Sequence, residues 1–261
     1  MYSDHPRCIY RANQLGEVIC QLRFPEILRI STDVPADFQD AIRAEFPQYT
    51  LLKEPHPPKL VGVPGNMSVQ QQEPTVNYQF TSADGIWRIN LTPRFIALAC
   101  TRYFRWEEFA RKLDKPLAAF IRIYQPAYFE RIGLRYVNFI SRKALDLTDV
   151  PFAQLINPQY LGLLSDEDTR ENSTIHSKVD ADTAIRGGCR IKIHAGPGMV
   201  RKGQQSDPEV KFVLDLDLYM PGKVPVNLSA GALQTLHAQA FPIFRGAITD
   251  TLHDALSPES I

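Results

Sequence analysis

Hydrophobic and polar residues alternate along several short stretches of the chain, and a period of two is typical of a β-strand with one buried face. The first stretch is GEVICQLRF, residues 16–24. Three more follow between residues 75 and 100, TVNYQFTS, IWRINLTP and FIALAC, separated by short turns such as ADG. This order predicts an N-terminal strand followed by an antiparallel meander of three strands.

Helical periodicity replaces this alternation after residue 105. Apolar residues recur every three or four positions from Trp106 to Tyr124, which predicts an amphipathic helix with a kink or restart at Pro116. The stretch FERIGLRYVNFI, residues 129–140, returns as a long strand.

Two segments lie between the first strand and the meander. VPADFQDAIRAEFPQY predicts a short helix with Asp33 as its N-cap and Pro35 in its first turn. Six prolines between Pro47 and Pro74 predict a loop, with one strand near residues 60–63.

The second half of the chain repeats the plan of the first. TIHSKVDADT and GCRIKIHAG predict a hairpin, KFVLDLDLYM predicts a third strand, and a long amphipathic helix begins at Ser229. DGIWRINL and GGCRIKI also share one pattern of glycine turn, arginine and isoleucine. We therefore predict an α+β fold, a mainly antiparallel sheet built from two meander-plus-helix units with the long helices on one face, and an internal duplication as its origin.

The predicted units divide the chain near residue 142. Residues 1–142 carry the N-terminal strand, the short helix, the first meander-helix unit and the return strand. Residues 143–261 carry the second unit, and we expect both to form one integrated domain, since 261 residues suit one large domain.

Composition indicates which classes of partner and which cell compartment to expect. Lys+Arg and Asp+Glu both number 29, so no overall charge attracts nucleic acid or an anionic membrane. The four cysteines, Cys8, Cys20, Cys100 and Cys189, are scattered without a C-x-x-C pair. Together with an N-terminus that lacks the pattern of a signal peptide, and with no long apolar run, they predict a cytoplasmic protein with no membrane contact.

The strand 129–140 carries the first candidate site. A period of two places Arg131, Gly133 and Arg135 on one face, opposite Leu134 and Tyr136. One interpretation is a two-arginine clamp for phosphate or carboxylate, with Gly133 allowing close approach. The other, which we favour, is that both arginines pair with carboxylates on neighbouring strands.

Asp215 and Asp217 form the second candidate, because they share a face of their strand. They could hold Mg²⁺ or act as an acid and base, but no further ligand falls at suitable spacing, so we predict no metal site and no cofactor. A cross-strand ladder with Arg190, Lys192 and His194 is the favoured interpretation.

A locally basic stretch offers a third surface. It contains Arg186, Arg190, Lys192, Arg201 and Lys202 and no acidic residue, so it could contact a nucleic-acid backbone. It lacks interleaved aromatic residues, and the acidic LSDEDTRE precedes it, so nucleic-acid binding is not favoured.

Three stretches give the chain a resemblance to a known family. They are GEVICQLRFP, with Glu17 opening the strand; RIGLRYVN, residues 131–138, which is the most specific; and FRGAITDTLHDAL near the end. The chain resembles a sporadically distributed family of uncharacterised bacterial proteins that carry an R-I-G-L-R-Y-x-N strand motif. Leu15 stands where the family usually has proline. The resemblance implies a place among defence or mobile-element genes and no catalytic residues.

The absence of a catalytic motif in a chain with a full set of core positions leads to the functional hypothesis. We expect a non-enzymatic binding or interaction protein, with a protein partner or a second copy as its ligand. The polar sheet face would carry the site, with the members Arg88, Arg131, Gly133, Arg135, Arg190, Asp215 and Asp217. The first alternative is an enzyme or sensor for a phosphorylated or anionic small ligand at the same face, and the second is nucleic-acid binding through the basic stretch.

Overall fold

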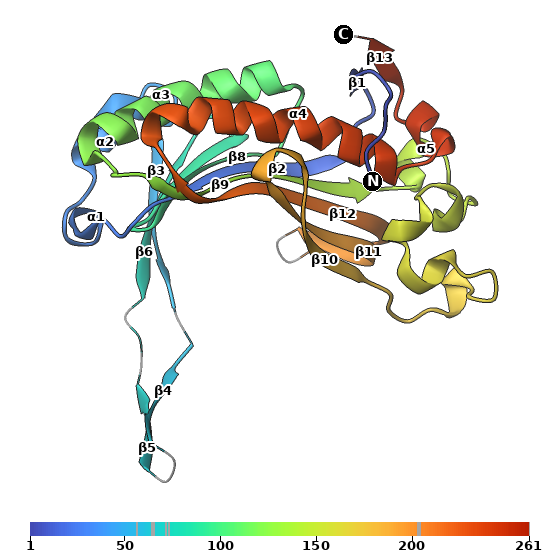
Figure 1. Cartoon of the computed structure of the whole chain (residues 1–261), viewed down its shortest axis with the longest axis horizontal. Coiled ribbons are helices and arrows are strands. Elements are labelled where there is room, and N and C mark those ends of the chain that lie inside the picture. Colours follow the sequence, from blue (N-terminus) through green and yellow to red (C-terminus); the bar gives the residue numbers. More distant parts are fainter. Residues whose placement is uncertain (56, 64–65, 71, 73, 203–204, 261) are drawn as a thin grey trace.

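A nine-stranded antiparallel sheet forms the body of the protein, and two long helices, α3 and α4, cover one of its faces (Figure 1). The computed structural model describes residues 1–55, 57–63, 66–70, 72, 74–202 and 205–260; for residues 59–62, 66, 201–202 and 205–206 it describes the backbone alone. No helix in this described part is long and apolar enough to cross a membrane.

The sheet has the strand order β10-β11-β12-β9-β2-β8-β7-β6-β3. Its strands are β2 (Leu15–Arg23), β3 (Gln48–Glu54), β6 (Thr75–Thr81), β7 (Trp87–Leu91), β8 (Phe95–Cys100), β9 (Phe129–Ile140), β10 (Val179–Ala184), β11 (Arg190–Lys202) and β12 (Gln205–Val224). Two small two-stranded sheets add β1 (Cys8–Tyr10) with β13 (Pro258–Ser260), and β4 (Lys59–Val63) with β5 (Asn66–Gln70).

The helices differ widely in length. They are α1 (Leu28–Thr32), α2 (Ala36–Ile42), α3 (Trp106–Tyr124), α4 (Ser229–Ala247) and α5 (Asp250–Ala255). Short 3₁₀ turns, η1 to η5, fill the connection between β9 and β10, and η6 and η7 precede β11 and α4.

Apart from the edge strand β3, the strand order is symmetric about the β2–β9 pair. A three-strand meander and a helix (β6-β7-β8-α3) follow β2, and the same series (β10-β11-β12-α4) follows β9. The last strand of each meander returns to pair with its own central strand, β8 with β2 and β12 with β9. The two meander-plus-helix units expected from the sequence are therefore present in one continuous sheet, with β9 as the counterpart of β2.

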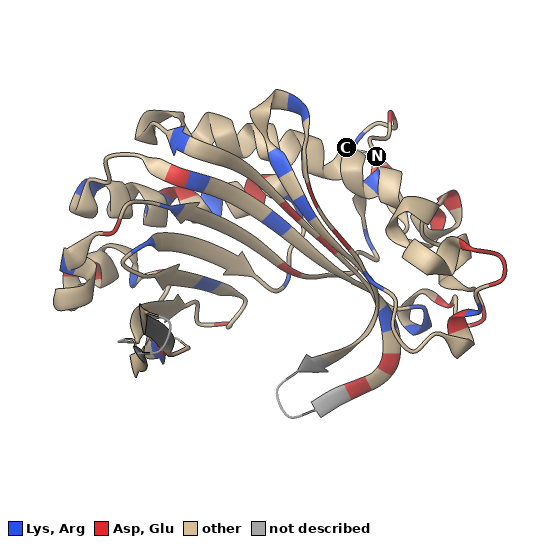
Figure 2. Cartoon of the chain, turned by 60° about the horizontal axis from the view of Figure 1, so that its bottom comes forward, with Lys and Arg blue, Asp and Glu red and all other residues tan. Residues whose placement is uncertain are grey.

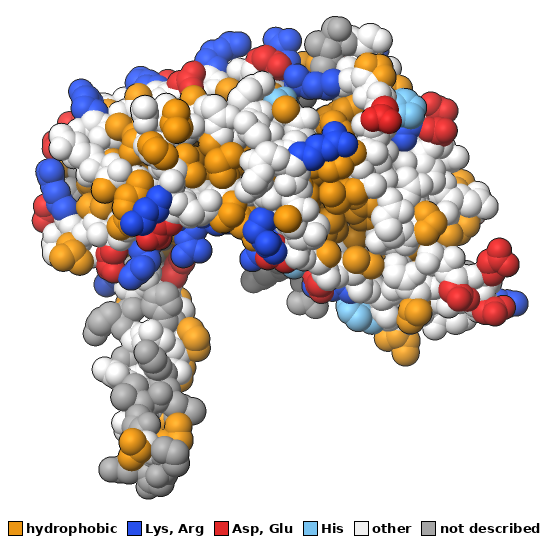
Figure 3. Space-filling model, in the orientation of Figure 1, with side chains coloured by type: hydrophobic (Ala, Val, Ile, Leu, Met, Phe, Trp, Pro, Cys, Tyr) orange, Lys and Arg blue, Asp and Glu red, His pale blue; other side chains and the backbone are white. Residues whose placement is uncertain are grey.

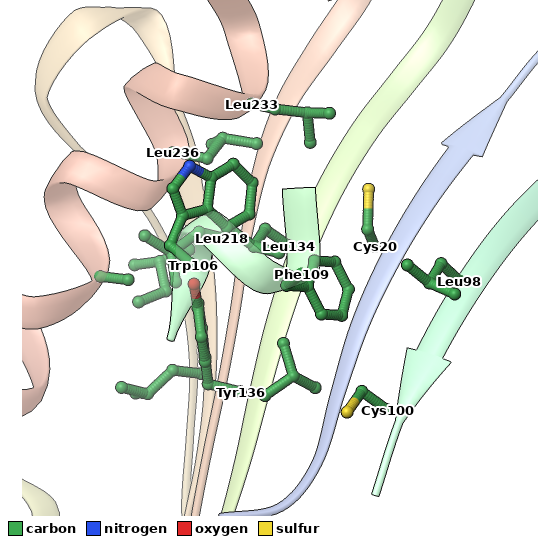
Figure 4. Packing of buried hydrophobic residues seen from close by; sticks show 14 of the residues in the cluster. Cys20, Leu98, Cys100, Trp106, Phe109, Leu134, Tyr136, Leu218, Leu233 and Leu236 are labelled. Carbon is green, nitrogen blue, oxygen red and sulfur yellow. The ribbon is translucent and has the colours of Figure 1, made fainter. Parts of the chain in front are cut away.

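One row of apolar side chains crosses the helix-covered face from strand to strand. Its members are cross-strand neighbours and all are buried: Phe80, Ile89, Leu98, Cys20, Leu134, Leu218 and Ile191. Figure 4 shows the middle of this row below α3 and α4, with Trp106 of α3 lying against Leu236 of α4. α3 packs on β8 and α4 packs on β9 and β12, and the buried residues of both halves form one continuous cluster, so the two units share a single core.

The segment after the short helix differs from the sequence prediction. The strand predicted near residues 60–63 is confirmed as β4, but the rest of the segment is not a loop. Strands β3 and β6 belong to the main sheet, and with the outer hairpin, β4–β5, they form a β-ribbon that projects away from it (Figure 1). Five of the prolines lie outside the strands, at residues 47, 55, 57, 58 and 74, and Pro64 lies outside the described residues. These prolines therefore marked strand ends, and interpreting them as loop missed β3 and β5.

The helices show smaller differences. α3 spans the predicted residues but continues through Pro116 without a restart. The last helix breaks at Ile248–Thr249, because Thr249 accepts a hydrogen bond from the backbone N–H of Leu252 and begins α5. Asp33 does not cap α2, whose N-cap position is Pro35.

The helix–sheet interface provides a direct test of this core. Phe120 of α3 is fully buried, and its ring lies 4.7 Å from that of Phe24. Phe120→Ala should lower the free energy of unfolding by about 3–5 kcal/mol, the usual cost of deleting a buried phenyl ring. Urea unfolding followed by circular dichroism measures the change. Arg122→Ala, exposed on the same helix, is the control and should stay within about 0.5 kcal/mol of wild type.

Candidate functional site

The sheet face away from α3 and α4 carries residues of both charges on its strands (Figure 2), and along one row the sign alternates from β10 to β9. One cross-strand row runs through the two units in the order Asp182, Lys192, Asp217, Arg135, Ile19, Ala99 and Arg88. We call this surface the open face. It brings together the predicted site residues Arg88, Arg131, Gly133, Arg135, Arg190, Asp215 and Asp217.

Gly133 provides the space in which the side chain of Arg131 lies. A Cβ atom at residue 133 would stand 2.9 Å from Cζ of Arg131 and would overlap Nη1. The Arg131 side chain runs along β9 over Gly133, packs 4.5 Å from the ring centroid of Tyr219 and donates to both carboxylate oxygens of Asp217 at 2.6 and 2.7 Å. The group that approaches Gly133 closely is therefore the protein's own arginine.

Arg135 repeats the arrangement one step further along the strand. Its Nε and Nη2 donate to the two oxygens of Asp215 at 2.8 and 2.5 Å, which is the bidentate geometry of a strong ion pair. Asp215 is 6% exposed in its side chain, whereas Arg135 is 44% exposed, so the arginine presents the charge to solvent. The hydrogen bonds to Asp215 raise the pKa of Arg135.

The predicted ladder between β11 and β12 has the expected register but other ion pairs. Lys192 lies opposite Asp217 and His194 opposite Asp215, yet both aspartates bind the arginines of β9 instead. Arg190 and His194 of β11 turn to the edge strand β10, where Arg190 pairs with Asp182 at 2.9 Å and His194 contacts Asp180. The hydrogen bonds from His194 and Lys178 lower the pKa of Asp180.

Tyr219 links the ion pairs between β9 and β12 to those between β10 and β11. Its hydroxyl lies 3.0 Å from Nε of Arg190 and donates to Asp182 at 3.1 Å, while Arg131 packs on its ring. On the other side of the sheet centre, Arg88 crosses the small side chain of Ala99 to reach Glu17 at 3.0 Å. The open face is thus a connected network of paired charges.

The basic stretch does not form one patch in the described part of the chain. Arg186 packs 4.1 Å from the ring of Tyr2, Arg190 pairs with Asp182, and Lys192 stands between acidic residues of β10 and β12. The side chains of Arg201 and Lys202 lie outside the described residues.

The open face offers few side chains that are placed to bind a metal ion. Asp215 and Asp217 each face an arginine, and the described residues include no group of three or more histidine, cysteine or acidic side chains placed to hold a metal ion. The arrangement can present preorganised charges and hydrogen-bonding groups to a partner.

A pocket beneath α4 was not predicted from the sequence. It lies on the helix-covered side, where β9 contributes Tyr136 and Asn138 and α4 contributes His237. His237 stacks on Trp106 with ring centroids 4.5 Å apart and contacts the Tyr136 hydroxyl at 3.2 Å. Asn138 could have signalled this pocket, because it is a polar residue on the apolar face of its strand.

Comparison with known proteins assigns neither a family nor a function to the chain. No protein-family model matches the sequence, and no curated protein matches it.

Gly133 can be tested by a double-mutant cycle. Gly133→Ala should displace the guanidinium of Arg131 from Asp217 and cost roughly 1–2 kcal/mol of unfolding free energy, since a charged hydrogen-bonded pair is lost. In an Arg131→Ala background the obstructing side chain is gone, so Gly133→Ala should cost much less. Equal costs in the two backgrounds, measured by urea unfolding, would show that Arg131 is not the reason for this glycine.

His237 gives the fold a pH dependence with a defined sign. Burial is the main cause that lowers its pKa from 6.5 to about 4, so the unfolded chain binds a proton in this range that the folded chain does not. Stability should therefore fall as pH falls from 6.5 to 4, by at most about 3 kcal/mol from this residue. His237→Gln should flatten the slope of unfolding free energy against pH, whereas His176→Gln, exposed, should leave it unchanged.

Proposed function

We propose that the chain is a non-catalytic binding protein that holds another protein against its open face and its projecting ribbon. The observation that carries this proposal is the arm, which consists of β4, β5 and the ends of β3 and β6 next to them and leaves the sheet on the side away from α3 and α4 (Figures 1 and 3). The arm and the open face therefore bound one common space, into which a partner can fit.

The arm exposes apolar side chains that no described part of the chain covers. On β4 and β5 the exposed fractions are 67% for Val63, 58% for Met67 and 66% for Val69. Leu51 and Leu52 of β3 are also exposed. A two-stranded ribbon is marginally stable in water by itself, and uncovered apolar side chains on it are typical of a surface that becomes buried in a complex.

The open face favours a protein partner of mixed charge. Four of its arginines, Arg88, Arg131, Arg135 and Arg190, are already held by carboxylates, so these four are fixed in position and largely neutralised. Alternating charges of this kind select a complementary protein surface and fix its register. A phosphorylated small ligand or a nucleic acid would have to compete with these carboxylates for the same guanidinium groups, so we place both alternatives second.

Three further proposals belong with this function. A second copy could pair with the exposed edge strand β3, since an unpaired strand edge readily adds another strand. The matching topology of the two units is what an internal duplication would produce. The resemblance in residues 131–138 supports a role among bacterial defence or mobile-element genes, and this could be tested by inspecting the gene neighbourhood.

The arm can be tested without disturbing the core. Met67→Ser combined with Val69→Ser removes two apolar side chains from one face of β5, so capture of the native partner should fall at least tenfold while the melting temperature stays unchanged. Gln70→Ser, on the same strand, is the matched control and should capture the partner as wild type does. The measurement is quantitative affinity purification from the native cells, followed by the native mass of the purified complex.

A test of the open face requires a double variant that changes both members of an ion pair, so that no charge is left unpaired. Arg135→Gln with Asp215→Asn neutralises one ion pair and keeps hydrogen-bonding groups, so it should weaken the same capture with only a small loss of stability. Equal recovery of the same proteins by all variants would contradict the proposal. A native mass of two copies with no other protein would instead make the second copy the occupant.

A further inference from the structure

The pocket beneath α4 is separate from the open face, because it lies on the opposite side of the sheet. Its volume is about 110 Å³. Its walls come from the N-terminal segment 7–15, residues 103–105 just before α3, β9, β12, α4 and Leu256. Nothing in the proposed partner-binding function uses it.

The floor of the pocket holds polar atoms that the described chain leaves without partners. Asn138 is 3% exposed, and its amide nitrogen donates to the backbone oxygen of Leu214 at 3.1 Å, whereas its Oδ1 accepts no hydrogen bond within the described residues. Nε2 of the buried His237 is likewise unpartnered there. Asn138 lines the pocket and its oxygen has no protein donor there, so it is a position at which a ligand donor can bind.

The walls are mainly aromatic. Around the floor stand the rings of Tyr10, Tyr103, Tyr136, Phe241 and Phe244. Several pack edge to face, such as Tyr103 against Tyr136 at 5.8 Å and 88° and Tyr10 against Phe244 at 5.8 Å and 68°. Walls of this kind suit a flat ring, because offset and edge-to-face contacts are the favoured arrangements between aromatic groups.

The mouth of the pocket is positively charged. Arg7 and Arg105 line it and are exposed, as is Phe104. Arg7 pairs with Glu107 at 3.2 Å, but no carboxylate in the described part of the chain lies within ion-pairing distance of Arg105. A guanidinium without a partner at the entrance of an apolar pocket matches a ligand carboxylate.

From these three features we propose that the pocket binds a small aromatic carboxylate that carries a hydrogen-bond donor opposite its acid group. The ring lies among the aromatic walls, the carboxylate meets Arg105 at the mouth, and the donor reaches Oδ1 of Asn138. At about 110 Å³ the pocket is smaller than the cavity of about 150 Å³ that accommodates benzene, so it can enclose no more than one ring, with the carboxylate outside at the mouth. Long acyl chains are too large for this space.

The test uses 4-hydroxybenzoate as the probe and the full chain as the protein, with binding followed by NMR chemical-shift titration. Binding should be saturable, and should weaken at least fivefold for benzoate, which lacks the donor, and for 4-hydroxybenzamide, which lacks the charge. Arg105→Gln should weaken 4-hydroxybenzoate at least fivefold and leave 4-hydroxybenzamide unchanged.

A filling variant locates the site. Ala240→Leu adds three carbon atoms to a residue that lines the pocket and should abolish saturable binding, with a melting temperature that verifies the fold. If Ala240→Leu fails to fold, Arg105→Gln alone decides the outcome. Absence of saturable shifts in wild type, or equal affinity of wild type and Arg105→Gln for 4-hydroxybenzoate, would overturn the proposal. Neither result bears on partner capture by the arm.

Discussion

The antiparallel pairing of β2 with β9 joins the two halves of the molecule, and the other features depend on it. Val18 pairs with Tyr136, Cys20 with Leu134 and Leu22 with Ile132, all buried beneath the helices. On each side of this pair a meander returns to its own central strand, so one apolar row extends across seven strands of the sheet. Without the central pair each half would be an open meander with an exposed core edge, which the hydrophobic effect strongly disfavours.

The same pairing gives β9 two distinct faces. Arg131, Gly133 and Arg135 point to the open face and build its ion-pair network, whereas Tyr136 and Asn138 point under α4 and form the pocket floor. β9 therefore contributes to two surfaces. Each of its side chains belongs to only one of them, because successive side chains of a strand point to opposite faces of the sheet. The open face and the pocket can act independently for this reason.

The arginines show how a polar sheet face can be ordered without a ligand. Each guanidinium reaches along its strand to a carboxylate beyond its direct cross-strand neighbour, so the charges are fixed by diagonal contacts. The half-buried geometry and the bidentate hydrogen bonds make these pairs stronger than exposed surface pairs, while Arg135 remains accessible. In the proposed complex, the arm contributes the apolar area that a charged surface alone lacks.

The sequence by itself determined the local elements and their faces. Periods of two and of 3.6 placed β2, the β6–β8 meander, α3 and β9 almost residue for residue, and the parity of β9 placed Arg131 and Arg135 away from the core. The tertiary structure decided which carboxylates those arginines bind, that Arg131 itself occupies the space over Gly133, and that segments 100 or more residues apart enclose a pocket. It also decided that the proline-rich segment forms a ribbon, because the backbone hydrogen bonds between strands join residues that are far apart in the sequence. Periodicity reports how a residue is oriented within its element, whereas the identity of its neighbour depends on register and topology, which no single stretch contains.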